Sequence, residues 1–159
     1  MRFLLLLSLA VGLAACDAGR VEPDPDALQV AEVVFARPDG EVVAYSHDDH
    51  WHGTLRATVG TPTALDVWLV TADAPQTGHD VPPRESWARP SAHDGVSVRV
   101  TSDDESVASY AVAGDAVTLT AGAAGTALTT VVVLDGSTTR YQSPPAPTIT
   151  SAPATASAR

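Results

Sequence analysis

The sequence predicts an all-β protein, an antiparallel β-sandwich of about seven to nine short strands. Three observations indicate this fold class. Apolar and polar residues alternate over many short runs rich in β-branched side chains, which is the pattern of half-buried strands. Gly, Pro and Asp residues that favour turns separate these runs at close spacing. After the first 15 residues, no run repeats with the period of an amphipathic helix.

The alternation is clearest in two segments, 65–70 and 96–101. Each has apolar residues at every second position, starting at Leu65 in the first and at Val96 in the second. Further strands are expected over residues 29–36, 42–46, 55–59, 109–113, 116–121, 128–134 and 138–142. Turn residues at 38–40, 60–62, 114–115, 122–125 and 135–136 punctuate them, as antiparallel neighbours require.

Composition marks the limits of the folded part. Residues 16–27 are acidic and interrupted by prolines, which is typical of an extended tether. Residues 143–159 contain four prolines among Ser, Thr and Ala, with Ile149 as the one large aliphatic residue. Such a segment buries too little apolar surface to offset its loss of chain entropy, so we expect a disordered tail. The sandwich domain is therefore expected over residues 28–142.

The first 16 residues have the order of an export signal. Arg2 supplies a positive charge, residues 3–11 are apolar, and small residues precede Cys16, the only cysteine of the chain. This run resembles the export signal of bacterial lipoproteins. The resemblance implies cleavage after residue 15, a lipid on Cys16, and attachment to a bacterial membrane on its periplasmic side or at the cell surface. The alternative is an ordinary secretory signal that leaves a free exported thiol.

The second half of the sequence carries another resemblance. Val100-Thr101-Ser102-Asp103-Asp104-Glu105-Ser106-Val107-Ala108, followed by the Gly114–Leu119 and Ala123–Ala127 stretches, is similar to bacterial Ig-like domains of the second group. The likeness covers residues 96–134. It implies an Ig-like sandwich with a role in display or adhesion, and it implies no catalytic residues.

Charge narrows the choice of partners. The chain has 9 basic residues, all of them Arg, against 19 acidic residues, and its formal net charge is −10. A surface with this balance repels phosphate backbones, so we expect no nucleic-acid partner. A membrane, through the lipid on Cys16, and a protein of the cell envelope remain the expected partners.

Three of the five histidines lie in the segment 47–52. On an extended chain His50 and His52 project to the same face, and a turn at residues 48–49 returns His47 to it. Three imidazoles on one face can bind a zinc ion, or another divalent ion such as copper, with a fourth ligand completing the tetrahedron. The spacing is similar to the repeated motif of streptococcal histidine-triad surface proteins, which are linked to zinc acquisition. Solvent-facing histidines without a metal are the alternative.

A long connection, residues 74–94, offers three candidates for a fourth metal ligand: His79, Asp80 and His93. Nucleophile-elbow, phosphate-loop and zinc-protease motifs do not occur. Glu41 and Glu85 are the nearest glutamates before and after the histidine segment, and we expect no glutamate close enough to act as a base. The sequence therefore predicts no enzyme. It favours a membrane-tethered module that binds zinc for sequestration or transfer, with a structural or adhesion module of the envelope as the alternative.

Overall fold

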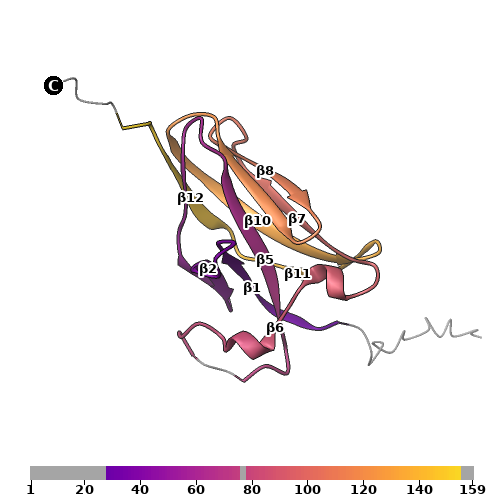
Figure 1. The fold of residues 1–159 in the computed structure, drawn as a ribbon. Helices are drawn as coiled ribbons and strands as arrows, with labels where there is room; N and C mark the ends of the chain where they lie inside the picture. The colour runs from indigo at the N-terminus through magenta and orange to yellow at the C-terminus, as the bar shows by residue number, and fades with distance from the viewer. Residues whose placement is uncertain (1–27, 76–77, 155–159) are drawn as a thin grey trace, which may run out of the picture.

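Two β-sheets pack face to face, which confirms the predicted β-sandwich (Figure 1). The structure is a computed structural model, and it describes residues 28–75 and 78–154. Cys16 and the segments expected to be signal and tether lie outside the described residues. All strand pairs are antiparallel except β4 with β12, which are parallel.

The first sheet carries the residues of interest for function. Its strands lie in the order β3, β2, β1, β5, β9 and β8, with the short β6 beside β5. Their bounds are β1 (Val30–Ala36), β2 (Val42–His47), β3 (His50–Gly53), β5 (Thr63–Thr71), β6 (Trp87–Ala88), β8 (Ala108–Ala113) and β9 (Ala116–Ala121). The β2–β3 hairpin forms one edge of this sheet.

The second sheet is built around its longest strand. β10 (Gly125–Asp135) pairs with β11 (Thr138–Gln142), β12 (Ala146–Ser151) and β7 (Val96–Ser102), and β12 also pairs with β4 (Leu55–Thr58). Two short 3₁₀ turns, η1 (Arg84–Ser86) and η2 (Pro90–Ala92), lie in the long connection between β5 and β7.

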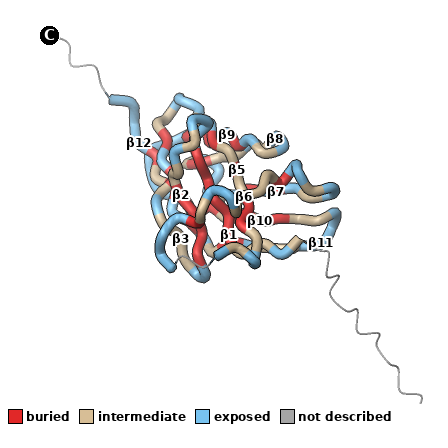
Figure 2. The backbone as a smooth tube through the Cα atoms, turned by 60° about the horizontal axis from the view of Figure 1, so that its bottom comes forward, coloured by how far each residue is buried: buried red, intermediate tan, exposed pale blue. Residues whose placement is uncertain are grey.

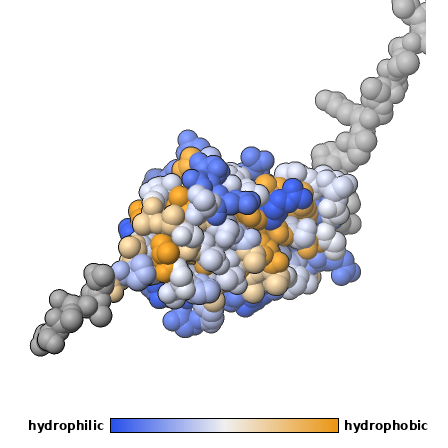
Figure 3. All heavy atoms as spheres, turned by 90° about the horizontal axis from the view of Figure 1, so that it is seen from above, coloured by the Kyte–Doolittle hydropathy of each residue, from blue (hydrophilic) through white to orange (hydrophobic). Residues whose placement is uncertain are grey.

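The core forms where the apolar positions of both sheets meet. On β5, Leu65, Val67 and Leu69 are buried at alternate positions, as the sequence pattern predicts. The backbone segments that carry buried residues lie in the interior (Figure 2). Outside, polar and apolar side chains are interspersed over the face shown in Figure 3. Each sheet therefore turns one apolar face inward and leaves its other face for other contacts.

A second apolar cluster lies on the outer face of the first sheet. It contains Val34, Tyr45 and Val70, with Trp68 and Trp87 packed against them. The ring centroids of Trp68 and Trp87 are 5.9 Å apart. Trp87 belongs to the connection between β5 and β7, so part of the long connection 74–94 covers this face.

All nine expected strands are present, but the predicted end of the domain at residue 142 is wrong. Residues 146–151 form β12, which lies between β10 and β4. The inward positions of this strand are Ala146, Thr148 and Thr150, which are buried although they are small or polar. Thr148 is satisfied by the hydroxyls of Tyr110 and Thr129, at 2.7 Å from each. The segment therefore orders itself through strand pairing and hydroxyl bonds and not through large apolar side chains.

Candidate metal centre

The β2–β3 hairpin places two histidines side by side on the outer face of the first sheet. His47 pairs with His50, and Tyr45 pairs with His52. The turn needs a left-handed residue, and Asp48 supplies it with a φ of 48°, which Asp tolerates better than most residues. The predicted turn at residues 48–49 is therefore confirmed.

The residue between His50 and His52, Trp51, points the other way and holds the hairpin in place. The ring of Trp51 lies 5.8 Å from that of Phe35, and its Nε1 donates a hydrogen bond of 2.7 Å to the carbonyl of Pro144. Pro144 lies just before β12 of the second sheet. The indole thus anchors the hairpin to the core and keeps His50 and His52 on the opposite face.

A third histidine reaches the same place from the connection after β5. His79 is exposed, and its carbonyl accepts a hydrogen bond of 2.5 Å from the Tyr45 hydroxyl. The Tyr45 ring in turn stacks on His52, with centroids 4.8 Å apart and an interplanar angle of 16°. One tyrosine therefore orients His52 and tethers the backbone of His79.

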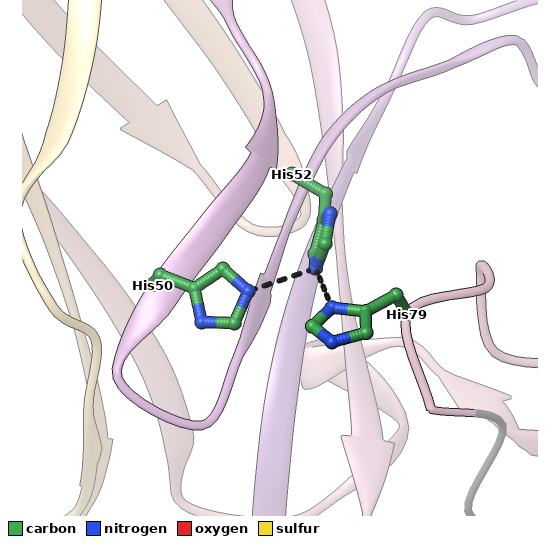
Figure 4. A group of neighbouring side chains, drawn as sticks. All are labelled: His50, His52 and His79. Atoms are coloured by element: carbon green, nitrogen blue, oxygen red, sulfur yellow. Dashed lines mark hydrogen bonds between the residues drawn. The ribbon is translucent and has the colours of Figure 1, made fainter.

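The three side chains direct ring nitrogens toward one another (Figure 4). His52 Nε2 lies 3.0 Å from His50 Nε2 and 3.2 Å from His79 Nδ1, and the three ligand atoms all lie within 4.8 Å of one another. Two nitrogens bound to one tetrahedral zinc at ~2.0–2.1 Å are about 3.3 Å apart. The spacing of His52 from its two neighbours is thus close to that of a metal site.

Hydrogen bonding alone satisfies this arrangement poorly. An imidazole nitrogen has either one proton or one lone pair in the ring plane. His52 Nε2 faces two ring nitrogens and can make one good hydrogen bond with only one of them. A cation between the rings accepts a lone pair from each nitrogen. His50, His52 and His79 could therefore hold a metal ion.

The protonation of His52 also favours metal binding. Burial, and then the neighbouring charges of His50, His79 and His47, lower the pKa of His52. A neutral imidazole is the form that ligates a metal. The ring of His50 is oriented by Asp49, because His50 Nδ1 lies 3.1 Å from Asp49 Oδ1. This contact leaves His50 Nε2 for the ion.

His47, the first of the three predicted ligands, lies beside this group with its ring turned to a carboxylate. Its Nδ1 is 2.9 Å from Glu32 Oε1, and its Nε2 is 3.4 Å from Asp48 Oδ2. The hydrogen bond with Glu32 is the main cause that raises the pKa of His47. Its ring centroid is 5.6–6.0 Å from those of the other three histidines.

Glu32 is the residue that the sequence analysis missed. We expected no glutamate near the histidines, but β1 pairs with β2 so that Val34 lies opposite Tyr45, and this register brings Glu32 to His47. The signal was present in the sequence as a single acidic residue within the apolar run 30–36.

Of the candidate fourth ligands, His79 joins the group and the other two do not. Asp80 is near enough for its charge to contribute to the raised pKa of Tyr45, after burial and Glu32. His93 follows η2, before β7, and its Nε2 is buried without a hydrogen-bond partner among the described residues.

Comparison with known proteins gives no match to a family model and none to a curated protein. Within residues 28–75 and 78–154, no helix has the length and apolar character needed to cross a membrane.

Proposed function

We propose that this protein binds a divalent transition metal through His50, His52 and His79, and that the metal is zinc. The observation that carries the proposal is the convergence of three ring nitrogens on one point, with His52 Nε2 at 3.0 and 3.2 Å from its neighbours. The pattern of one central nitrogen facing two others is what a shared cation explains and a hydrogen-bond network does not.

The donor set favours zinc over other common ions. Calcium and magnesium prefer oxygen ligands, whereas imidazole nitrogens suit zinc and its first-row neighbours. Copper(I) prefers thiolate and thioether ligands, and the only methionine and cysteine of the chain are Met1 and Cys16. Copper(II), which also accepts imidazole, is the main competitor in a binding assay.

The position of the site supports exchange of the ion with the surroundings. The three histidines lie on the outer face at a sheet edge, two of them half-buried and His79 exposed. Together with the lipoprotein-like signal that ends at Cys16, this favours sequestration or transfer of zinc by a module tethered to the bacterial envelope. The proposal assigns the protein no reaction.

Titration of the metal-stripped full chain with zinc, in a mild detergent, tests the proposal. We expect one zinc per chain, and loss of that zinc in the His50→Ala, His52→Ala double variant. His93→Ala is the matched control, because it removes a histidine outside the group and should keep the zinc. A wild-type chain that takes up no zinc or other transition metal would leave a structural or adhesion role as the better explanation.

A further inference from the structure

We infer that His47 and Glu32 form a carboxylate–imidazole arm that brings a fourth imidazole to the metal and closes the site. The inference rests on the proposed function, since it needs a metal bound at His50, His52 and His79. It assigns a role to Glu32, a positioning residue that reaches the metal only through His47.

The ring centroids of the four histidines lie at similar distances from one another. Among His50, His52 and His79 the centroid distances are 4.7, 5.1 and 5.5 Å, and from His47 they are 5.6, 5.8 and 6.0 Å. Four imidazoles around a tetrahedral zinc at ~2.0–2.1 Å per nitrogen have centroids about 5.2 Å apart. All six distances are near this value, so the rings form a slightly elongated tetrahedron.

His47 needs only a small displacement to reach the position of a fourth ligand. His47 reaches the ideal distance by a shift of its ring of less than about 1 Å toward the other three, together with a turn about its side-chain bonds. A turn of this kind moves Nε2 away from Asp48, a contact of 3.4 Å to a side chain that is 80% exposed. The contact that must be given up is therefore a weak one.

Glu32 supplies the second, independent observation. Its side chain is 10% exposed, its Oε1 lies 2.9 Å from His47 Nδ1, and its Oε2 is buried without a hydrogen-bond partner among the described residues. A buried carboxylate with one free oxygen is costly unless a positive charge lies near it. A protonated His47 ring can provide that charge in the metal-free chain, and a dication bound at Nε2 of the neutral ring takes its place.

The arm has the form in which proteins present histidine to a metal. Ligating imidazoles usually donate their other N–H to a carboxylate, which fixes the ring and raises its basicity. Glu32 takes this position at Nδ1 of His47, and Asp49 takes it at Nδ1 of His50. In both cases Nε2 is the nitrogen left for the ion.

Closure has a chemical consequence. A site with three protein ligands keeps a position for water, whereas a site with four is typical of metal that is held and not used for catalysis. The arm therefore makes the site selective for ions that accept a tetrahedral set of nitrogens, such as Zn²⁺ and Co²⁺. This agrees with sequestration and disfavours an exchangeable metal-bound water.

Cobalt and zinc spectroscopy on the full chain test the inference. We expect an intense tetrahedral Co²⁺ spectrum and X-ray absorption of the zinc form that fits four imidazole nitrogens. In His47→Ala the fit should change to three nitrogens and one oxygen. Glu32→Gln should lower zinc affinity by roughly 10–100-fold, the usual effect of losing an outer-shell partner. It should not lower the melting temperature of the metal-free chain, because it removes a buried charge. His93→Ala is the control.

The outcomes separate the two proposals. If the wild-type chain binds no metal, the proposed function fails. If it binds zinc but His47→Ala keeps both the affinity and the four-nitrogen fit, the proposed function stands and the arm is refuted. Because His47→Ala leaves Glu32 as an unpaired buried charge, the Glu32→Gln, His47→Ala double variant gives the same comparison without that charge. A three-nitrogen, one-oxygen fit in the wild type also refutes the arm.

Discussion

In the proposed site His52 is the central ligand, so its replacement should abolish metal binding and leave the fold intact. Its Nε2 makes both of the short nitrogen contacts in the group, at 3.0 and 3.2 Å. In His52→Ala, His50 and His79 lose the one ring nitrogen that lies within 3.2 Å of both. His47 does not replace it, because its ring nitrogens face Glu32 and Asp48. We expect the stabilisation of the fold by zinc to disappear in this variant.

The size of the effect follows from linkage. At a free zinc concentration 100 times the dissociation constant, a ligand that binds only the folded state adds about 2.7 kcal/mol to the free energy of unfolding. For a chain of this length, that corresponds to a rise in melting temperature of roughly 8 °C. Without zinc, the variant loses the Tyr45–His52 stacking contact, worth about 0.5–1.5 kcal/mol.

Thermal unfolding followed by circular dichroism, with and without zinc, measures both effects. The wild type and His93→Ala should melt higher in zinc, and His52→Ala should melt at the same temperature in either condition. A zinc-induced rise in His52→Ala of more than half the wild-type value would refute the central role of His52. The loss of stacking appears separately, as a small decrease in the metal-free melting temperature.

Four further variants test the fold and its link to the site. Gly53→Ala should weaken both zinc affinity, measured by titration, and stability, measured by urea unfolding. The reason is that φ at Gly53 is 80° and an added Cβ would lie 2.2 Å from the carbonyl oxygen of Val43. Leu55→Ala, at a fully buried position, should cost about 2–5 kcal/mol in urea unfolding. Burial raises the pKa of Tyr110, so its protonated hydroxyl stabilises the fold fully below pH ~10 and less as the pH rises above that value. Tyr110→Phe should therefore cost about 1 kcal/mol at pH 7 and melt with a flatter alkaline profile. Truncation after Gln142 removes β12 and should abolish cooperative unfolding, whereas a disordered tail would be lost without effect.

The strands could be predicted because alternating apolar residues indicate the inward face of each sheet and turn residues mark where the strands end. Where the inward residues are small or polar, this pattern is absent. β12 was missed because its inward Thr148 is satisfied by the Tyr110 hydroxyl, which lies 38 residues earlier in the chain. β3 (His50–Gly53) was missed because it is only four residues long and carries no aliphatic side chain that would mark an inward face.

The site was predictable as far as it is local. The spacing of His50 and His52 fixes their common face, and residues 48–49 had the composition of a turn. The further ligand could be narrowed to three candidates, one of them His79. No local rule predicts where a long connection will lie over a sheet face. Glu32 depended on the pairing register of β1 and β2, which the sequence pattern does not state.

The β-sandwich holds most of the histidines of the proposed site in fixed positions. Three of the four histidines belong to a hairpin whose Trp51 side chain is fixed by Phe35 and by the Pro144 carbonyl on the other side of the core. These rings need little ordering when an ion arrives, which favours affinity. His79 is different, because it is exposed and its backbone is held by the Tyr45 hydroxyl. The hairpin therefore sets the geometry of the proposed site, and His79 is its one exposed ligand.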